Sequence, residues 1–191
     1  MPSAIAEIPG LTYSPDYLNS DEQAQLLTLI DQQTWLTDLK RRVQHYGYRY
    51  DYKTRKVDEN FYLGPLPEWL TPLAKRLHTD GYIADAPDQA IINEYEAGQG
   101  IARHVDCIPC FGDTIISLSL GSACVMVYTE IATQHEVPIL LTPGSLVVMQ
   151  GKSRYDWMHA IPARKSDVLH GQVIKRGRRV SVTFRKVILQ H

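Results

Sequence analysis

Residues 179–185 read RVSVTFR, and polar and apolar side chains alternate along the whole stretch. Alternation with a period of two is typical of a β-strand, because successive side chains point to opposite faces of a sheet. One face carries two valines and a phenylalanine, and the other carries Arg179 and Arg185 at its ends. The arginines therefore lie either in solvent on an edge strand or inside a barrel, where buried guanidinium groups need anionic partners.

If the two arginines lie inside a barrel, their spacing indicates which anionic partner would fit between them. Their Cα atoms are ~20 Å apart in an extended strand that rises about 3.3 Å per residue. Two side chains that lean toward each other leave a gap of a few ångströms. Such a gap suits a short dicarboxylate, with one guanidinium on each carboxylate.

The rest of the C-terminal half has the same β character. Runs of β-branched and aromatic residues between Gly, Pro, Asn and Asp turns predict strands over residues 90–96, 114–120, 124–129, 137–141, 146–150 and 179–187. In the first of these, Asn93 and Tyr95 share one face. Many short strands after early helices favour mainly antiparallel sheets in a jelly-roll or related double-sheet barrel backed by N-terminal helices.

Two helices are expected before the strands begin. Ser20 as the N-cap and Gln23 at N3 form a capping box, and the apolar spacing that follows extends this helix to about Gln33. Pro72 at the first helical position predicts a second helix over residues 71–81.

Composition limits the class of protein. The chain has 191 residues, of which 44% are hydrophobic and 21% charged, which is ordinary for one globular domain. No signal peptide is visible in the first twenty residues, and no run approaches the ~18–20 apolar residues of a membrane span. Three cysteines argue against a disulfide framework and favour a reducing cytoplasm.

Residues 103–113, RHVDCIPCFGD, contain an H-x-D pattern. In extended chain His104 and Asp106 share a face and reach one ion, and His159 in the stretch WMHAI is the best third ligand. Two histidines and one carboxylate leave open positions on the metal, as in non-haem Fe(II) oxygenases. A chance H-x-D with ordinary surface residues is the alternative.

The same stretch contains a C-x-x-C pattern at Cys107 and Cys110. A redox pair of this kind belongs at the start of a helix, but here a strand follows. A structural zinc needs four closed ligands, and Cys124 has no ligand partner beside it in the sequence. We therefore interpret the C-x-x-C as incidental.

Six motifs, taken in order, resemble the AlkB family of Fe(II)- and 2-oxoglutarate-dependent dioxygenases. They are N-x-Y-x-x-G at 93–98, H-x-D at 104–106, SLSLGS at 117–122, PGSLVVM at 143–149, SRYDWMHAI at 153–161 and RVSVTFR at 179–185. The resemblance covers roughly residues 41–186 and implies a double-stranded β-helix, a form of jelly-roll barrel.

The resemblance also implies the site residues. The Fe(II) ligands would be His104, Asp106 and His159. The residues that hold 2-oxoglutarate would be Asn93, Tyr95, Arg179 and Arg185, with the first arginine on the distal carboxylate and the second near the carboxylate close to iron. AlkB itself carries an Asn where this chain has Ser181, so Ser181 is left out of the assignment.

Residues 41–52, RRVQHYGYRYDY, resemble the loop by which the family covers its substrate nucleotide. Alternate tyrosines are expected to share a face, so that two stack on a flipped base while basic residues meet phosphates. The substrate-binding residues are then Tyr46, Tyr48, Tyr50, Arg49, Lys53 and Arg55. An amphipathic ribbon whose tyrosines pack on the barrel is the alternative. Residues 175–178 would either add phosphate contacts or form an exposed hairpin turn.

The function implied is oxidative demethylation of N-alkylated bases of the 1-methyladenine or 3-methylcytosine type. The substrate would be single-stranded or damaged DNA or RNA, as in DNA repair or RNA modification. Dioxygen is the co-substrate, and succinate, CO2 and formaldehyde are released. EYEAGQGI, SLSLGS and KRGRRVSVTFRK look closer to a eukaryotic homologue that hydroxylates a modified wobble uridine in tRNA. There are three alternatives: this tRNA hydroxylation, an oxygenase that acts on protein or a small molecule, and a non-catalytic binding module.

The expected organisation is one dioxygenase domain over residues 1–191. It would have a helical N-terminal extension at 1–40, a substrate lid at 41–63 and the catalytic barrel at 89–187. We expect a cytoplasmic monomer that does not bind membranes.

Overall fold

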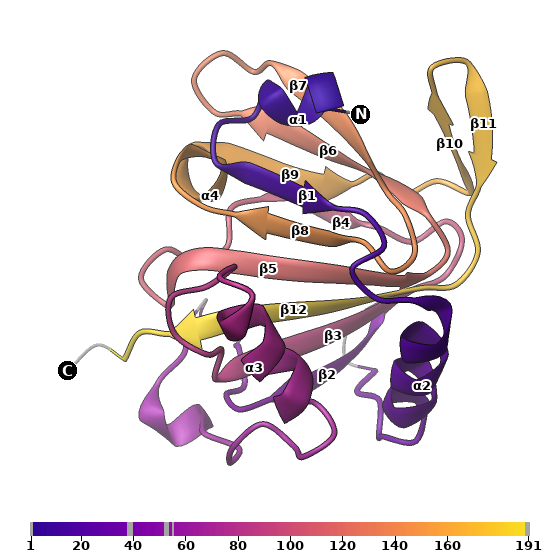
Figure 1. Cartoon of the computed structure of the whole chain (residues 1–191). Coiled ribbons are helices and arrows are strands. Elements are labelled where there is room, and N and C mark those ends of the chain that lie inside the picture. The colour runs from indigo at the N-terminus through magenta and orange to yellow at the C-terminus, as the bar shows by residue number, and fades with distance from the viewer. Residues whose placement is uncertain (1, 38–39, 52–53, 55, 190–191) are drawn as a thin grey trace.

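The structure is a computed structural model that describes the chain apart from residues 1, 38–39, 52–53, 55 and 190–191 (Figure 1). The elements in chain order are α1 (Pro2–Ala6), β1 (Leu11–Ser14), α2 (Ser20–Asp31), β2 (Arg42–Tyr46), the 3-10 helix η1 (Glu59–Phe61), α3 (Thr71–Thr79), β3 (Gln89–Tyr95), β4 (Ile101–His104), β5 (Phe111–Gly121), β6 (Cys124–Glu130), β7 (Glu136–Leu141), β8 (Leu146–Met149), α4 (Lys152–Tyr155), β9 (Trp157–Ile161), β10 (Ser166–Leu169), β11 (Gln172–Lys175) and β12 (Arg179–Val187).

Two antiparallel sheets face each other. The larger sheet has the strand order β1-β8-β5-β12-β3-β2, and the smaller one has the order β4-β9-β6-β7. In Figure 1, β6 and β7 of the smaller sheet lie at the top, the β1–β8 edge of the larger sheet overlaps β9 and β4, and α2 and α3 lie beside the lower strands of the larger sheet. This arrangement confirms the predicted jelly-roll barrel backed by helices.

The register of β12 explains how the barrel interior becomes polar. β12 pairs with β3 on one side and with β5 on the other. Arg179 lies opposite Tyr95, and Ser181 lies opposite Asn93. Residues directly opposite each other share a face of the sheet, so the polar groups of the two strands form one stripe toward the interior.

The other face of β12 is apolar and meets the helices. Val182 and Phe184 are fully buried in a cluster that includes Leu26 of α2 and Leu77 of α3. The alternation in RVSVTFR thus sets both layers. Its apolar side anchors the helices, and its polar side lines the barrel.

The predicted helices form, with one correction to the cap. The N-cap of α2 is Asn19, whose side chain accepts from the Glu22 N–H at 3.0 Å while the Glu22 carboxylate accepts from the Asn19 N–H at 2.8 Å. The predicted box on Ser20 and Gln23 is therefore wrong by one residue. Gln23 instead donates to the Leu18 carbonyl, so it is not available to complete a box.

The region before residue 41 is not purely helical. β1 pairs antiparallel with β8 and forms the edge of the larger sheet. Among the described residues, no helix is long and apolar enough to cross a membrane.

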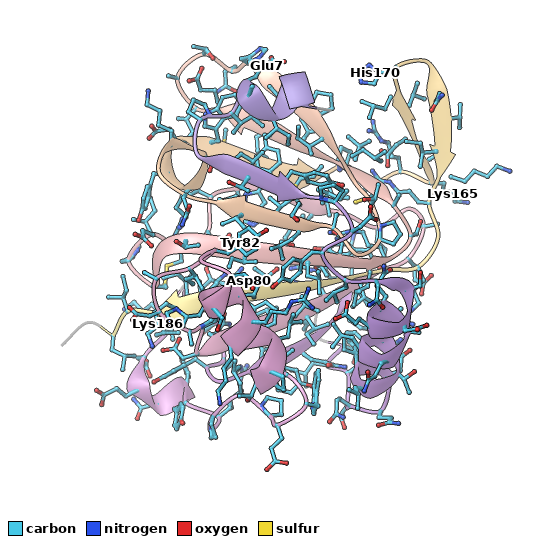
Figure 2. All side chains as sticks on the ribbon, viewed as in Figure 1. Glu7, Asp80, Tyr82, Lys165, His170 and Lys186 are labelled. Carbon is cyan, nitrogen blue, oxygen red and sulfur yellow. A yellow bond between two sulfur atoms is a disulfide. The ribbon has the colours of Figure 1, made fainter. Side chains whose placement is uncertain are left out.

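A hairpin formed by β10 and β11 projects from the body of the protein (Figure 1). Its base is anchored by Asp167, which is fully buried and accepts from Arg176 and Arg164 at 2.6 Å. Lys165 lies at the base of the hairpin, and His170 lies at its tip (Figure 2). Arg178 forms ion pairs within the protein, with Glu94 and Asp31. Of the basic residues in 175–178, Lys175 is the exposed one that forms no ion pair among the described residues, which favours the hairpin interpretation.

Candidate active site

His104, Asp106 and His159 meet inside the barrel. β4 and β9 pair so that His104 lies opposite His159, and their ring centroids are 4.3 Å apart. Asp106 follows β4 in the next turn and points its carboxylate at the same place. The possible ligand atoms of the three residues all lie within 4.8 Å of one another. The predicted triad therefore forms a site that fits one metal ion.

Two of the ligands, His104 and Asp106, are held by hydrogen bonds that leave one atom of each free for the metal. His104 Nδ1 lies 2.8 Å from the Ala102 carbonyl oxygen. A donating Nδ1–H leaves Nε2 as the basic nitrogen. Arg185 Nη2 donates to Asp106 Oδ1 at 2.7 Å. The other oxygen, Oδ2, lies 3.9 Å from His159 Nε2.

The protonation states suit metal binding at neutral pH. Burial, together with His104, lowers the pKa of His159 to about 3, so its imidazole is neutral. Burial alone would raise the pKa of the Asp106 carboxyl, but the Arg185 guanidinium and the imidazoles hold that pKa well below its ordinary value. A neutral histidine and an ionised aspartate are the forms that coordinate metal.

Behind the triad lies a narrow inner cavity with buried donors. Arg179 is 2% exposed, and its Nη2 donates to Ser119 Oγ at 2.9 Å. Its Nε and Nη1 have no hydrogen-bond partner among the described residues. Buried guanidinium donors without acceptors are costly, so this end of the cavity fits the carboxylate of a bound acid.

The two other predicted co-substrate residues line the same cavity. The Tyr95 ring lies under the Arg179 guanidinium, 5.5 Å from its carbon. Asn93 Oδ1 accepts from Arg41 Nε at 2.8 Å. That contact leaves the amide N–H groups of Asn93 for a ligand. Both arginines of the R-x5-R strand are buried, so the edge-strand alternative is wrong.

In front of the triad lies a second, wider space. This cleft has a volume of about 560 Å³. It shares Asn93, His104, Asp106 and Arg185 with the inner cavity. The triad thus stands at the junction of two spaces, and a metal there would face a co-substrate on one side and a substrate on the other. The other residues that line the cleft include Arg41, Tyr50, Arg103, Ile131 and Met158.

Of the predicted substrate residues, Tyr50 is the one that the structure places in this cleft. Its ring packs against Phe111 with centroids 5.8 Å apart. Tyr46 packs instead on Trp69, and Tyr48 packs on Tyr62. Arg49 is exposed. Lys53 and Arg55 lie outside the described residues.

Tyr46 packs against the cluster on the helix side of the sheet, whereas Tyr48 and Tyr50 pack against the other core cluster, and Gly47 is the reason. β2 ends at Tyr46, and Gly47 has a φ of 75°, which L-residues rarely adopt. A Cβ on Gly47 would lie 1.8 Å from the Asp88 carbonyl oxygen. The chain therefore turns at this position, and the parity of the strand is lost.

The cysteine interpretation is also corrected. Cys107 and Cys110 are joined in a disulfide, with Cα atoms 5.3 Å apart. The Cys110 N–H donates to the Cys107 carbonyl at 3.3 Å. The chain thus makes a tight turn immediately after Asp106, which brings the two side chains together. Cys124 is buried and free.

Sequence reasoning missed three residues of the site: Ser119, Tyr128 and Arg154. Ser119 lies in the SLSLGS motif and binds Arg179. Arg154 is 2% exposed and donates to backbone carbonyls of the turn that carries Asp106. Its position in SRYDWMHAI, close to His159, was the available signal. Tyr128 had none, because a tyrosine in a strand is ordinary packing.

Comparison with known proteins agrees with this geometry. A family model described as the 2OG-Fe(II) oxygenase superfamily matches residues 12–185. The chain belongs to that superfamily, and Fe(II) and 2-oxoglutarate are its cofactor and co-substrate. Within it, the chain is a member of the AlkB family of dioxygenases, as its relatives show.

The relatives are as follows. The chain is 36% identical over 203 residues to the alkylated DNA repair protein ALKBH8 homolog of Arabidopsis thaliana, a match that covers 94% of this chain and 59% of that protein. It is 40% identical over 203 residues to the tRNA (carboxymethyluridine(34)-5-O)-methyltransferase ALKBH8 of Mus musculus, with coverage of 94% and 30%. The chain thus spans less than two thirds of the length of each relative, 59% of the first and 30% of the second. The solved structure of OsALKBH1 shares the fold, with a TM-score of 0.71 at 18% identity over 93% of this chain and 98% of that chain.

Proposed function

We propose that this AlkB-family enzyme oxidises N-alkylated bases in single-stranded or damaged nucleic acid and releases the alkyl group as an aldehyde. For an N-methyl base of the 1-methyladenine or 3-methylcytosine type, the products are the unmodified base and formaldehyde. The observation that carries the proposal is the cleft of about 560 Å³ that opens onto His104 and Asp106 and contains Tyr50.

The cleft suits a flat base. Tyr50 offers an aromatic face at one side, and Ile131 and Met158 offer apolar contacts. Stacking on an aromatic side chain contributes about 1–3 kcal/mol per base. A base must leave its helix to reach such a site, which is easiest in damaged or single-stranded nucleic acid.

Cationic groups at the cleft suit a phosphate backbone. Arg41 lines the cleft and holds Asn93. Arg103 lines it as well and pairs with Glu136, and both members of that pair are exposed. Exposed pairs are weak, so Arg103 is free to exchange Glu136 for a phosphate. The name of the Arabidopsis relative, which refers to alkylated DNA repair, also supports this substrate class.

The chain's own residues position the reaction. His104, Asp106 and His159 would hold Fe(II), which with dioxygen and 2-oxoglutarate supplies an oxidant strong enough to attack a C–H bond while the acid leaves as succinate and CO2. Arg179 and Tyr95 would hold the distal carboxylate, and Asn93 would orient the keto acid end. Arg185 fixes Asp106 so that one carboxylate oxygen faces the metal. Apolar walls restrict water beside the oxidant.

The test uses protein reconstituted without oxygen from Fe(II) and 2-oxoglutarate, and then exposed to air with short single-stranded DNA or RNA carrying 1-methyladenine or 3-methylcytosine. Mass spectrometry follows the methyl group, and succinate is measured in parallel. We expect the base to lose its methyl group and formaldehyde and succinate to form, all three in equal amounts. The His159→Ala variant is the inactive control. Succinate without demethylation of either base would contradict this substrate class.

A second candidate is hydroxylation of a modified uridine in tRNA. The observation that favours it is the 40% identity to the mouse relative whose name refers to carboxymethyluridine at position 34 of tRNA. The hydroxyl group would then stay on the product, because it forms on a carbon that carries no nitrogen. Incubation with total tRNA and mass spectrometry of its nucleosides separates the two, since a gain of one oxygen replaces the loss of a methyl group.

The division of the chain into functional segments is a further part of the proposed function. We propose an N-terminal extension at 1–40, a substrate lid at 41–63 and a catalytic barrel at 89–187 within one domain. A monomer in the cytoplasm fits an enzyme that acts on nucleic acid.

A further inference from the structure

Tyr128 lies in the middle of β6 and points into the inner cavity behind the triad. Its side chain is fully buried, and its ring centroid is 6.1 Å from that of His159. The phenolic oxygen has no hydrogen-bond partner among the described residues. A polar group in this position needs a physical explanation, because nearly all buried hydroxyl groups in proteins are paired.

The unpaired hydroxyl is not isolated. Arg179 lines the same cavity, and its Nε and Nη1 also have no partner among the described residues. With Arg185 Nε, four buried donors in this cavity therefore have no hydrogen-bond partner among the described residues. An unpaired buried donor is costly, and a sequence that tolerates this cost four times in one cavity is adapted to acceptors that arrive with a ligand.

The positive charge of Arg179 indicates which chemical group of the ligand binds here. A carboxylate only accepts hydrogen bonds and offers about four lone pairs, which matches a guanidinium plus a phenol. Asp106 is not that acceptor, because it accepts from Arg185 Nη2, while the Tyr128 hydroxyl and the Nε and Nη1 of Arg179 have no hydrogen-bond partner among the described residues. The Arg185 end of β12 thus already has a carboxylate beside it, and the Arg179 end has none.

We propose that Tyr128 is a binding residue for 2-oxoglutarate, its phenolic O–H donating to the distal carboxylate that Arg179 also binds. The resemblance to AlkB proteins assigned this carboxylate to the first arginine of the strand, Arg179, and the structure adds a donor from the opposite sheet. β6 belongs to the smaller sheet and β12 to the larger one, so the distal carboxylate would be clamped between the two layers of the barrel.

The decisive variant is Tyr128→Phe, which removes one oxygen atom and keeps the packing of the ring. The protein is loaded with Mn(II) without oxygen, and 2-oxoglutarate is titrated by calorimetry. A hydrogen bond to a charged group is worth about 1.5–3 kcal/mol, so we expect the dissociation constant to rise about 10- to 100-fold. The unfolding free energy of the ligand-free variant should not fall, because the lost hydroxyl has no partner there.

A second ligand isolates the distal carboxylate. 2-Oxovalerate has the same keto acid end and chain length but carries a methyl group in place of that carboxylate. Wild type and Tyr128→Phe should bind it with equal affinity. The difference between the two ligands therefore reports the contact between the phenol and the distal carboxylate alone.

Tyr17→Phe is the matched control. Tyr17 is also buried, but its hydroxyl donates to Asp80 Oδ2 at 2.8 Å and lies outside the cavity. This variant should lose stability without ligand and keep the wild-type affinity for 2-oxoglutarate, which is the opposite pattern to Tyr128→Phe.

Three results would overturn the proposal. Equal affinity of wild type and Tyr128→Phe for 2-oxoglutarate would show that the hydroxyl makes no contact. Equal weakening for 2-oxoglutarate and 2-oxovalerate would place its effect elsewhere in the cavity. A loss of ligand-free stability as large as that of Tyr17→Phe would show that the hydroxyl has a partner in the protein. Because no nucleic acid is present, these results do not depend on the proposed base substrate.

Discussion

Arg154 offers a test of how the metal site is held. It is 2% exposed, and no carboxylate among the described residues pairs with it. Its guanidinium donates instead to the backbone carbonyls of Asp106 at 2.9 Å, Cys107 at 3.3 Å and Phe111 at 3.5 Å, and to the Gly112 carbonyl at 3.3 Å. A single side chain thus fixes both ends of the turn that follows the metal ligand.

The change to make is Arg154→Met, which keeps most of the length and removes the donors. One bond is short and three are long, so we count the short one at about 1.5–3 kcal/mol and the others near the low end of about 0.5–1.5 kcal/mol each. Relief of the buried charge offsets part of this sum. We expect the unfolding free energy to fall by about 3 kcal/mol, and metal affinity to fall about 10- to 100-fold, as for other groups that orient a ligand.

The assay pairs urea unfolding with calorimetric titration of Mn(II), and it needs a control that is equally destabilised. Arg176→Met provides one, because Arg176 is buried and makes three bonds of 2.6–2.7 Å to Asp167 and the Pro162 carbonyl at the base of the hairpin. Breaking that buried pair costs about 3–5 kcal/mol, and Arg176 lines neither the inner cavity nor the cleft at the triad. Equal metal affinity in the two variants would refute the reasoning. Arg154→Lys should recover part of the affinity.

Three further predictions address the ligands, the cleft and the pH dependence of stability. His159→Ala should remove measurable Mn(II) binding and succinate formation while the protein stays folded, as judged by circular dichroism. Tyr50→Ala should lower kcat/KM for the nucleic acid about tenfold with no change in 2-oxoglutarate affinity, since one stacking contact is worth about 1–3 kcal/mol; Tyr46→Ala, whose ring packs on Trp69, should change stability only. Hydrogen bonds from Arg42 and Arg178 lower the pKa of the buried Glu94, so the native state takes up its proton at lower pH than the unfolded state does. The stability that Glu94 provides is therefore complete above pH 4.5 and is lost as the pH falls further. In urea unfolding, the free energies of wild type and Glu94→Gln should differ most near neutral pH. A difference that grows on acidification would contradict this direction of the pH dependence.

Sequence reasoning succeeded where one periodic pattern determines many contacts. The alternation in residues 179–185 predicts a strand with both arginines on one face, and the many short strands after early helices predict the double-sheet barrel that encloses this face. His104 and Asp106 are two residues apart on one short segment, so their convergence is local. Only His159 had to come from another strand; it was the best third ligand in the sequence, and the family resemblance supported it.

The positions of side chains could not be predicted where they depend on a single backbone angle or on a tertiary contact. The tyrosines of the lid alternate in the sequence, but Gly47 turns the chain at a φ of 75° and separates Tyr46 from Tyr50. The role of Arg154 depends on carbonyls that lie more than forty residues away. Tyr128 is indistinguishable from a core tyrosine until the opposite sheet, with its unpaired Arg179, is in place.

The most direct measurement is a crystal structure of the protein grown without oxygen in the presence of Mn(II) and 2-oxoglutarate. We predict one Mn(II) bound by Nε2 of His104, Oδ2 of Asp106 and Nε2 of His159. The keto acid end of 2-oxoglutarate should lie on the metal, with its distal carboxylate at Arg179, and the cleft beside Tyr50 should remain open. A metal bound elsewhere, or 2-oxoglutarate lying in the outer cleft, would contradict the assignment of the two spaces on which the proposed function depends.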